Sequence, residues 1–338
     1  MQNPYKDKIN QLLEQFLTKK LEQDGKYSPH TKELISNIRE YTMRSAKRIR
    51  PLVAIFAYKC FKDDEKIVFP SISLELIQSY LLIHDDIMDR SDLRRGKPTM
   101  HKIYSYPDEH FGISTAILAG NVCASYMYET ILESEFSNKE KNAAIAALCW
   151  INDRENYGQA LDIIPGFTNL TEEGILKLQE LKTATYTVQG PIMFGCALAG
   201  APKKVSKKLQ EYALNIGLAF QLQDDLNGIF GPVEEIGKPN DSDIKEGKKT
   251  LIILKALELA TPENKQYLID NYGKQDLTSE QVGRIRFIID GCGAKDACKK
   301  RLSEFVDAGK KALEGLELRE EGKNSLLEMA DYILSLFK

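Results

Sequence analysis

Residues 74–89 read LELIQSYLLIHDDIMD, an apolar stretch that ends in three aspartates. Its apolar side chains, Leu74 and Ile77 among them, recur at helical spacing, so one buried helix is predicted to run into Asp85. If the helix continues, Asp85 and Asp89 lie on one face with Cβ atoms roughly 5 to 6 Å apart. The two carboxylates repel each other, and the negative pole of a helix C-terminus disfavours them further. A divalent cation relieves both effects, and carboxylate, water and phosphate oxygens suit magnesium.

A second acidic pair closes another apolar helix, predicted to span roughly residues 203–226. Residues 220–225 read FQLQDD, and the position four beyond Asp224 is Gly228. Only one carboxylate therefore remains on that helix face, which suits one metal ion rather than two. Either acidic pair alone is equally compatible with a solvated helix end, but two such pairs after apolar helices favour metal binding.

Clusters of basic residues accompany both acidic pairs. The net charge is −3, so a phosphate site must come from local clustering of Lys and Arg. Residues 47–51 read KRIRP and open a predicted helix, where basic groups and free backbone N–H groups can hold phosphate. Each basic residue alone is better explained as solvated surface, whereas clusters beside acidic helix ends favour phosphate binding. The other clustered residues are Arg94, Arg95, Lys97, Lys182, Lys238, Lys248 and Lys249.

Helical spacing dominates the rest of the chain, and strand-like alternation is almost absent. With 338 residues, 43% hydrophobic and 28% charged, the composition is that of a globular protein with a substantial core. Amphipathic helices after residue 250 are interrupted near Gly273 and residues 291–293. We predict one all-α domain over residues 1–338, with about ten or more helices around a long core. Other helices are predicted over residues 112–135, 138–158 and 171–200.

The pattern argues against several other classes of protein. The six cysteines form no CxxC pair, so buried thiols in a reducing cytoplasm are expected. No apolar leader and no run of membrane-spanning length occurs, so neither export nor membrane insertion is expected. The loop from Asp241 to Gly247 has Glu246 where an EF-hand requires glycine, and no GxxxxGK[ST] loop is present. The overall charge gives no reason to expect a nucleic-acid partner.

Taken in chain order, these motifs resemble those of the trans-prenyl diphosphate synthases. The resemblance runs from about Ala46 to Leu254, and the ordered set is specific although each motif alone is weak. It rests on residues 47–51, 78, 85–89, 94–96, 182–183, 220–225, 237–239, 242–244 and 248. The resemblance implies a homodimer of all-α subunits with the isoprenoid synthase fold, an orthogonal helical bundle around a deep central cavity.

The resemblance also implies a role for each matching residue. Asp85 and Asp89 match positions that bind two magnesium ions, and Asp224 matches a position that binds a third, with Asp86 and Asp225 in support. The metal ions, about three per site, bind the oxygens of the allylic diphosphate. The residues that match allylic diphosphate contacts are Arg94, Lys182, Lys238 and Lys248. Those that match isopentenyl diphosphate contacts are Lys47, Arg50, Gln78 and Arg95.

The implied reaction is the head-to-tail 1'-4 condensation of isopentenyl diphosphate with dimethylallyl, geranyl or farnesyl diphosphate. Ionisation of the allylic diphosphate creates a delocalised cation and a diphosphate anion, which metal ions and basic side chains stabilise. The cation must be shielded from water, which requires an apolar cavity. Beside Lys182, the side chains of Thr183 and Gln221 are predicted to aim oxygen dipoles at the cation. The departing diphosphate, rather than a side chain, is expected to accept the proton.

One position departs from the pattern of many relatives. Gly228 stands where they have a third aspartate in the second acidic motif. A subset of similar enzymes also has glycine there, so activity is expected, with the third metal ion held more loosely. Asp225 and Asp243 are predicted to support that ion through water.

Product length is predicted from the helix before the first acidic motif, because the growing tail runs beside that helix in the family. Tyr80 lies five residues before Asp85, about 7.5 Å along the helix axis, and is the predicted floor with Leu81 and Ile77. Leu81 is not aromatic, unlike the paired aromatics of many farnesyl synthases. These features favour a geranylgeranyl product over a farnesyl one. The competing interpretation, that Tyr80 only packs a helix interface, stays open.

Two alternative functions remain compatible with the sequence. A terpene cyclase shares the first acidic motif but does not need the second diphosphate site suggested by Lys47, Arg50 and Gln78. A non-catalytic subunit of a prenyl synthase usually loses acidic ligands, whereas Asp85 and Asp89 are both present. A synthase is therefore the preferred interpretation.

Overall fold

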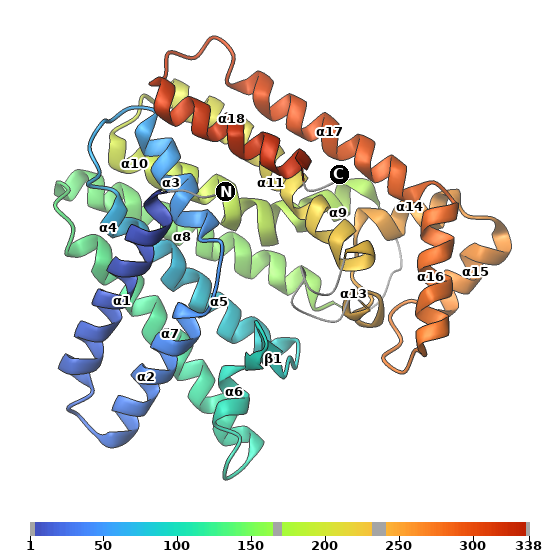
Figure 1. The fold of residues 1–338 in the computed structure, drawn as a ribbon, viewed down its shortest axis with the longest axis horizontal. Helices are drawn as coiled ribbons and strands as arrows, with labels where there is room; N and C mark the ends of the chain where they lie inside the picture. The colour runs from blue at the N-terminus through green and yellow to red at the C-terminus, as the bar shows by residue number, and fades with distance from the viewer. Residues whose placement is uncertain (1–3, 165–170, 232–240, 336–338) are drawn as a thin grey trace. The chain divides into compact units, whose positions relative to one another are not determined.

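The computed structural model describes residues 4–164, 171–231 and 241–335, and these residues are predominantly helical (Figure 1). The only strands in those ranges are two short ones, which pair with each other. The predicted all-α class is therefore confirmed. Lys238 and its neighbours in residues 237–239 lie outside the described residues.

The chain groups into two compact units, each with its own packing. Unit 1 consists of residues 1–152, 190–206 and 317–326. Unit 2 consists of residues 153–189, 207–316 and 327–338. Three helices contribute residues to both units: α8 (Asn138–Asp162), α11 (Lys203–Phe230) and α18 (Glu320–Ser335). The single domain over residues 1–338 stays a prediction.

Unit 1 contains the N-terminal helices and a short hairpin. Its elements are α1 (Pro4–Asp24), α2 (Pro29–Met43), α3 (Ile49–Lys59), α4 (Val68–Ser71), α5 (Ser73–Met88), β1 (Leu93–Arg94), β2 (Lys97–Pro98), α6 (Met100–Ile103), α7 (Glu109–Leu132) and α10 (Gly190–Ala199). Helix α5 packs along α7, α3 packs along α10, and α1 lies beside α2 (Figure 1). These contacts place α5 at the centre of the unit.

Helix α5 is buried because it is apolar on most of its faces. Leu74, Ile77 and Ile83 have no more than 1% of their surface exposed, and each fully buried side chain of this size contributes about 1.5 to 3 kcal/mol. The helix ends at Met88, and the N–H of the C-cap residue Asp89 donates to the Asp85 carbonyl at 2.8 Å. The predicted continuation of the helix into the first acidic motif is confirmed.

Unit 2 contains the second acidic helix and the C-terminal helices. Its further elements are α9 (Glu172–Gln179), the π-helix η1 (Glu180–Gln189), α13 (Ser242–Glu246), α14 (Leu251–Leu259), α15 (Pro262–Asn271), α16 (Ser279–Gly291) and α17 (Ala294–Ala312). The predicted breaks near residues 273 and 291–293 are confirmed, because Gly273 and Gly293 adopt positive φ angles of 90° and 85°. The helical stretch predicted over 171–200 is also present, but its middle third is a π-helix. Such widened turns are rare and often occur at functional sites.

The helices of the described residues include none that is both long and apolar enough to cross a membrane.

Candidate active site

The acidic end of α5 holds three aspartates in different environments. Asp89 is exposed and the Asp85 side chain is 16% exposed, whereas Asp86 has no exposed surface. All three carboxylates lie at the negative pole of the helix, where a cation is favoured. Asp85 and Asp89 keep contact with solvent, so a metal ion can reach them directly.

The buried carboxylate of Asp86 instead fixes other side chains of unit 1. It accepts hydrogen bonds from the Tyr41 hydroxyl at 2.6 Å and from Arg94 Nε at 2.8 Å. The pKa of Asp86 is raised, because burial disfavours its charge more than the Arg94 guanidinium favours it. The same guanidinium lies 3.5 Å from Asp85. Asp86 therefore holds Arg94 beside Asp85, one of the two aspartates of α5 that keep contact with solvent.

The β1–β2 hairpin sends two consecutive arginines in different directions. Its turn residues, Arg95 and Gly96, have φ angles of 55° and 73°, as a two-residue type I′ turn requires. Arg94 pairs with the acidic end of α5, whereas Arg95 Nη1 donates to the Arg44 carbonyl at 3.1 Å. The hairpin thus places Arg94 beside the aspartates of α5 and Arg95 beside other basic residues.

The basic neighbourhood surrounds the first turn of α3. Lys47 and Arg95 are exposed, while Arg50 and Gln78 are half-buried. The pKa of Arg95 is lowered by desolvation first, and nearby Arg50 adds to this by charge repulsion. A cluster of cations held in this way favours an anion with several negative oxygens, such as a diphosphate.

The second acidic pair lies inside α11, which continues to Phe230, so the helix does not end at this pair as predicted. The two carboxylates of the pair differ in exposure, as those of α5 do. Asp224 is exposed, whereas Asp225 is 3% exposed and accepts hydrogen bonds from Gln179 and Gln221, each at 2.7 Å. Burial raises the pKa of Asp225 to about 7, and the Gln221 hydrogen bond only partly offsets that effect. Asp224 is thus the metal-accessible member of the pair, and Asp225 orients its neighbours.

The contact with Asp225 fixes the orientation of the Gln221 amide. The amide nitrogen of Gln221 donates to Asp225 Oδ1, so this nitrogen faces the carboxyl group. The amide oxygen of this half-buried side chain therefore faces away from Asp225. This orientation is the one that the predicted cation-stabilising role requires.

Gly228 makes room for a carboxylate from a different element. A Cβ atom at this position would lie 2.0 Å from Oδ2 of Asp243 in α13. Asp243 is 2% exposed and pairs with Lys248 at 2.9 Å, and that carboxylate raises the pKa of Lys248 against the opposing effect of burial. The space that a third aspartate of the motif needs is therefore filled by Asp243.

We expect Gly228→Ala to lower the free energy of unfolding by about 1 to 2 kcal/mol. Overpacking costs about 1 to 3 kcal/mol, and the better helix propensity of alanine offsets about 1 kcal/mol of it. Turnover should also fall about tenfold as Asp243 and Lys248 move, since small misplacements are costly in catalysis. Urea unfolding and steady-state kinetics measure the two effects.

Gly283→Ala in α16 is the matched control, because nothing lies within 4 Å of a Cβ atom there. That variant should be as stable as the wild type or more so. Equal stability of the two alanine variants would show that Asp243 moves aside without cost.

Lys182 and Thr183 lie in η1, where a glycine of α8 allows close packing. A Cβ atom on Gly158 would lie 2.5 Å from the Lys182 backbone nitrogen. Lys182 Nζ pairs with Asp162 Oδ2 at 2.5 Å, and Thr183 is half-buried. The π-helix and the close approach of α8 together place Lys182 beside an acidic partner.

The predicted site residues that the structure describes divide into two groups according to the compact unit in which they lie. The group in unit 1 comprises Lys47, Arg50, Gln78, Asp85, Asp86, Asp89, Arg94 and Arg95. The group in unit 2 comprises Lys182, Thr183, Gln221, Asp224, Asp225 and Lys248. For product length, Ile77 and Leu81 are buried, and the half-buried Tyr80 ring lies 5.0 Å from the His84 ring, edge to face.

Sequence reasoning missed the residues that orient these groups. They are Tyr41, Glu75, Asp162 and Gln179, whereas Arg48 belongs to the predicted basic cluster over residues 47–51 and only its burial against Glu75 was missed. Glu75 alone carries a signal, since it is the only charged residue between Ile67 and Ile83. The others are ordinary polar residues whose partners lie far away in the sequence.

The carboxylates present fit magnesium that keeps part of its water shell. No group of three or more His, Cys, Asp or Glu side chains among the described residues forms a ready-made metal cage. Magnesium is commonly held by one or two carboxylates together with water and substrate phosphate oxygens. Asp85 with Asp89, and Asp224 in unit 2, match that donor set.

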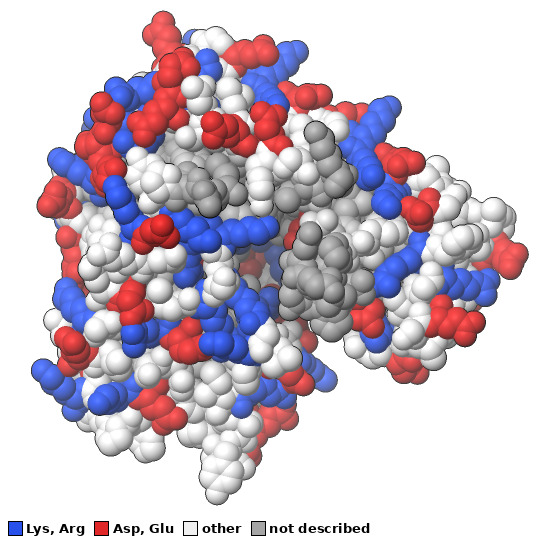
Figure 2. Space-filling model, viewed as in Figure 1, with Lys and Arg blue, Asp and Glu red and all other residues white. Residues whose placement is uncertain are grey.

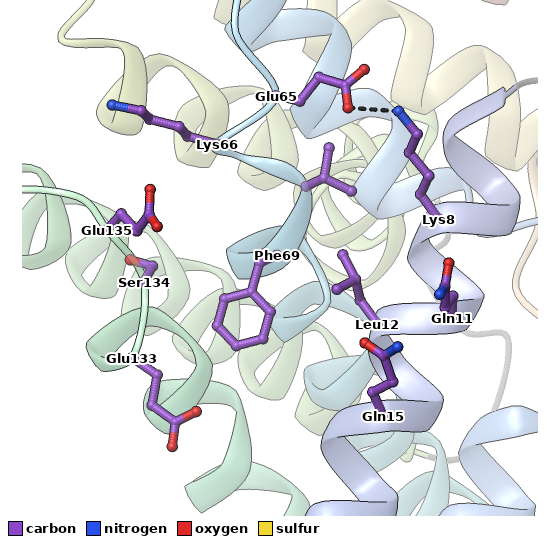
Figure 3. Close-up of a pocket in the computed structure, with 11 residues that line it drawn as sticks. Lys8, Gln11, Leu12, Gln15, Glu65, Lys66, Phe69, Glu133, Ser134 and Glu135 are labelled. Carbon is purple, nitrogen blue, oxygen red and sulfur yellow. Dashed lines mark hydrogen bonds and ion pairs between the residues drawn. The ribbon is translucent and has the colours of Figure 1, made fainter.

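Charge on the surface is locally paired rather than gathered into one field. Figure 2 shows both signs interspersed over the visible face, in keeping with the net charge of −3. A pocket of about 560 Å³ lies in unit 1 between α1, α4 and the end of α7, with Leu12 and Phe69 inside it and the Lys8–Glu65 ion pair at its edge (Figure 3). None of the predicted site residues lines this pocket.

Aspartate pairs on two helices beside clustered arginines and lysines are typical of all-α proteins that bind metal-complexed diphosphates. The family model described as polyprenyl synthetase matches residues 32–289. The chain therefore belongs to the polyprenyl synthetase family, and it is a prenyltransferase that makes prenyl diphosphates.

Relatives of this chain differ in the products for which they are named. It is 31% identical to a geranylgeranyl pyrophosphate synthase of Geoglobus acetivorans over 329 residues, which cover 96% of this chain and 95% of the relative. A short chain isoprenyl diphosphate synthase of Methanocaldococcus jannaschii is 33% identical over 275 residues, 80% of this chain and 81% of the relative. Others are named geranylfarnesyl and farnesyl diphosphate synthases.

The fold is shared with solved structures of such enzymes. A geranylgeranyl pyrophosphate synthase of Corynebacterium glutamicum, complexed with isoprenyl diphosphate and magnesium, superposes with a TM-score of 0.91 at 30% identity. The match covers 98% of each chain.

Proposed function

We propose that this enzyme condenses isopentenyl diphosphate head to tail with an allylic diphosphate and makes mainly geranylgeranyl diphosphate. The observation that carries the proposal is the β1–β2 hairpin, which gives Arg94 to the acidic end of α5 and Arg95 to the basic cluster. Two adjacent diphosphate subsites suit a reaction of two diphosphate substrates. A cyclase, with one diphosphate substrate, has no use for the second.

In this proposal the allylic diphosphate binds at the aspartates of α5 and α11. About three magnesium ions, held by Asp85, Asp89 and Asp224, supply electrostatic stabilisation of the leaving diphosphate. The geranylgeranyl synthase with bound magnesium supports this choice of metal. The side chains that bind the diphosphate directly are Arg94, Lys182, Lys238 and Lys248, of which Lys238 lies outside the described residues.

Isopentenyl diphosphate occupies the neighbouring basic cluster. Lys47, Arg50 and Arg95 provide the positive charge, and Gln78 provides a neutral hydrogen-bonding group. Gln78 lies seven residues before Asp85 on α5, about two turns away on the same face. The two substrates are thereby arranged along one helix.

The carbocation is stabilised without a strong nucleophile nearby. The Gln221 amide oxygen and the Thr183 hydroxyl oxygen offer dipoles to the cation. The isopentenyl double bond attacks the cation, and the departing diphosphate accepts the proton that is then lost. The reaction requires apolar surroundings for the tail that exclude water.

Tyr80 is proposed as the floor of the tail site, and Tyr80→Ala should lengthen the main product by at least one isoprene unit. The half-buried ring packs edge to face against His84, whose Nε2 lies 3.2 Å from the Ile117 carbonyl of α7. Removing the ring opens space for a longer tail beside α5. Chromatography of the dephosphorylated alcohols measures the change.

Tyr104→Ala is the matched control, because this tyrosine is also half-buried in unit 1 and its hydroxyl accepts a hydrogen bond from Asn37 at 2.7 Å. Its product profile should equal that of the wild type. An unchanged profile for Tyr80→Ala would assign the ring to helix packing alone.

The enzyme is further proposed to act as a homodimer through an outer face of α7. The helix carries no charged residue between Phe111 and Tyr128, yet Ile117 and Leu118 are 43% and 58% exposed. Exposed apolar side chains on an uncharged helix are typical of a covered interface. Sedimentation velocity at micromolar concentration tests this, and a monomer would contradict it.

The enzyme is proposed to work in the reducing cytoplasm, since all six cysteines are free thiols. Cell fractionation tests this location.

A product assay tests the reaction itself. Purified enzyme is incubated with magnesium, isopentenyl diphosphate and, separately, dimethylallyl, geranyl or farnesyl diphosphate. Geranylgeraniol from all three primers after dephosphorylation is the expected result. Farnesol as the main product would support the proposed reaction but show that the product is farnesyl rather than geranylgeranyl diphosphate. Cyclic hydrocarbons formed without isopentenyl diphosphate would favour a cyclase.

A further inference from the structure

The junction between α2 and α3 contains an arginine in a strained conformation. Arg48 is the N-cap of α3, with φ 55° and ψ 37°, and its side chain is 3% exposed. This left-handed region is uncommon for residues other than glycine and persists only where the surroundings enforce it. Backbone strain of this kind clusters at functional sites, and here it lies within a group of basic residues.

Three helices hold the Arg48 guanidinium. Nη1 donates to Glu75 Oε2 of α5 at 2.5 Å and to the Thr42 carbonyl of α2 at 3.0 Å, and Nε donates to Asn10 Oδ1 of α1 at 2.9 Å. With these partners and so little exposed surface, Arg48 is not placed to bind a substrate. It instead fixes the turn between its neighbours, Lys47 and Arg50.

Glu75 connects this turn to the helix that carries the site. It is 2% exposed and lies three residues before Gln78, so the two side chains are neighbours on α5. The lowered pKa of Arg95 reflects desolvation and then the positive charges of Arg48 and Arg50, with Glu75 acting in the opposite direction. Glu75 is therefore a carboxylate that interacts with both Arg48 and Arg95.

Stability alone does not explain this arrangement. A buried ion pair is a weak source of stability, because desolvation of the two charges offsets much of their attraction. A glycine would make the same positive-φ turn without strain. The buried pair has a clear use if the turn must hold its basic neighbours in one fixed geometry.

We propose that Arg48 and Glu75 form a positioning pair for the isopentenyl diphosphate subsite. The pair locks the positive-φ turn, so that Lys47, Arg50 and Arg95 converge on one diphosphate. Glu75 also balances their mutual repulsion before the substrate binds. The inference rests on the proposed function, since it assumes that isopentenyl diphosphate binds at this cluster.

The test compares the KM values of the two substrates in conservative variants. Arg48→Lys and Glu75→Asp keep both charges but change the geometry of the pair, and Arg48→Gly permits the turn without the pair. Each should raise the KM for isopentenyl diphosphate about tenfold or more, because small misplacements of binding groups are costly. The KM for the allylic diphosphate should change less than about twofold.

Lys20→Met is the matched control, because Lys20 is also buried and paired in unit 1, with Glu129 of α7. It should leave both KM values unchanged even if the melting temperature falls. Equal rises in both KM values, or a lower kcat alone, would assign Arg48 and Glu75 a structural role and overturn the inference. If Arg48→Gly does not fold, the two charge-conserving variants decide. A wild type that fails to elongate overturns the proposed function, whereas an active wild type with unchanged variants overturns only this inference.

Discussion

Asp85→Asn is expected to lower kcat about a thousandfold, or about 4 kcal/mol in the activation free energy. The substitution keeps the shape of the side chain and removes the negative charge from a carboxylate that is proposed to hold the metal ions at the end of α5. Half-saturation with magnesium should also shift to higher concentration, because a neutral amide is a weaker ligand. Kinetics over a magnesium titration, starting from chelator-treated enzyme, measure both effects.

Asp92→Asn supplies the control for a nearby carboxylate. The Asp92 side chain is 75% exposed and pairs with Lys102 at 3.0 Å, just beyond the acidic motif. Removing this surface charge should change activity less than about twofold, since exposed ion pairs contribute little. Activity of Asp85→Asn within tenfold of the wild type, with the same magnesium dependence, would remove Asp85 from the metal site.

Asp86→Ala is expected to destabilise the protein by about 3 kcal/mol and to lower activity about a hundredfold. Asp86 has no exposed surface, and its loss leaves the Arg94 guanidinium and the Tyr41 hydroxyl without their shared acceptor. Breaking a buried ion pair costs about 3 to 5 kcal/mol, and the lower value applies because Arg94 is 30% exposed. Urea unfolding gives the first quantity and steady-state kinetics the second.

The magnesium dependence separates two roles for Asp86. If it only positions Arg94, the KM for the allylic diphosphate rises while half-saturation with magnesium stays the same. A shift in the magnesium titration would instead support the role of a metal ligand. Tyr41→Phe is the graded control, because it removes one hydrogen bond at a cost of about 1 kcal/mol and leaves the Arg94 pair intact.

The helices were predictable because their signal is local. The apolar spacing before Asp85 predicts α5, and the run of apolar and small residues over 112–135 predicts α7, which the structure places at Glu109–Leu132. The earlier start of α7 follows from Asp108, whose side chain accepts a hydrogen bond from the Phe111 N–H at 2.8 Å. The π-helix was not predictable, since its residues have ordinary helical spacing and its wide turns depend on packing.

The candidate site was predictable only in part. Spacing alone predicts that aspartates four apart on a helix share one face. It also predicts an anion site where basic residues open a helix. The spacing separates Asp85 and Asp89 from Asp86, but it does not show that Asp86 accepts hydrogen bonds from Tyr41 and Arg94 while Asp85 meets solvent. Which carboxylate turns inward depends on the partners that neighbouring elements supply.

By itself the sequence determined that this protein is helical, that two helices carry aspartate pairs in their C-terminal parts, and that basic clusters accompany them, because each of these features follows from spacing along one segment. Only the tertiary structure decided that Asp243 fills the space beside Gly228 and that Arg48 is buried against Glu75. These contacts join residues 15 and 27 positions apart. The physical reason is that burial and pairing are set by long-range packing, which residue spacing within a single helix does not encode.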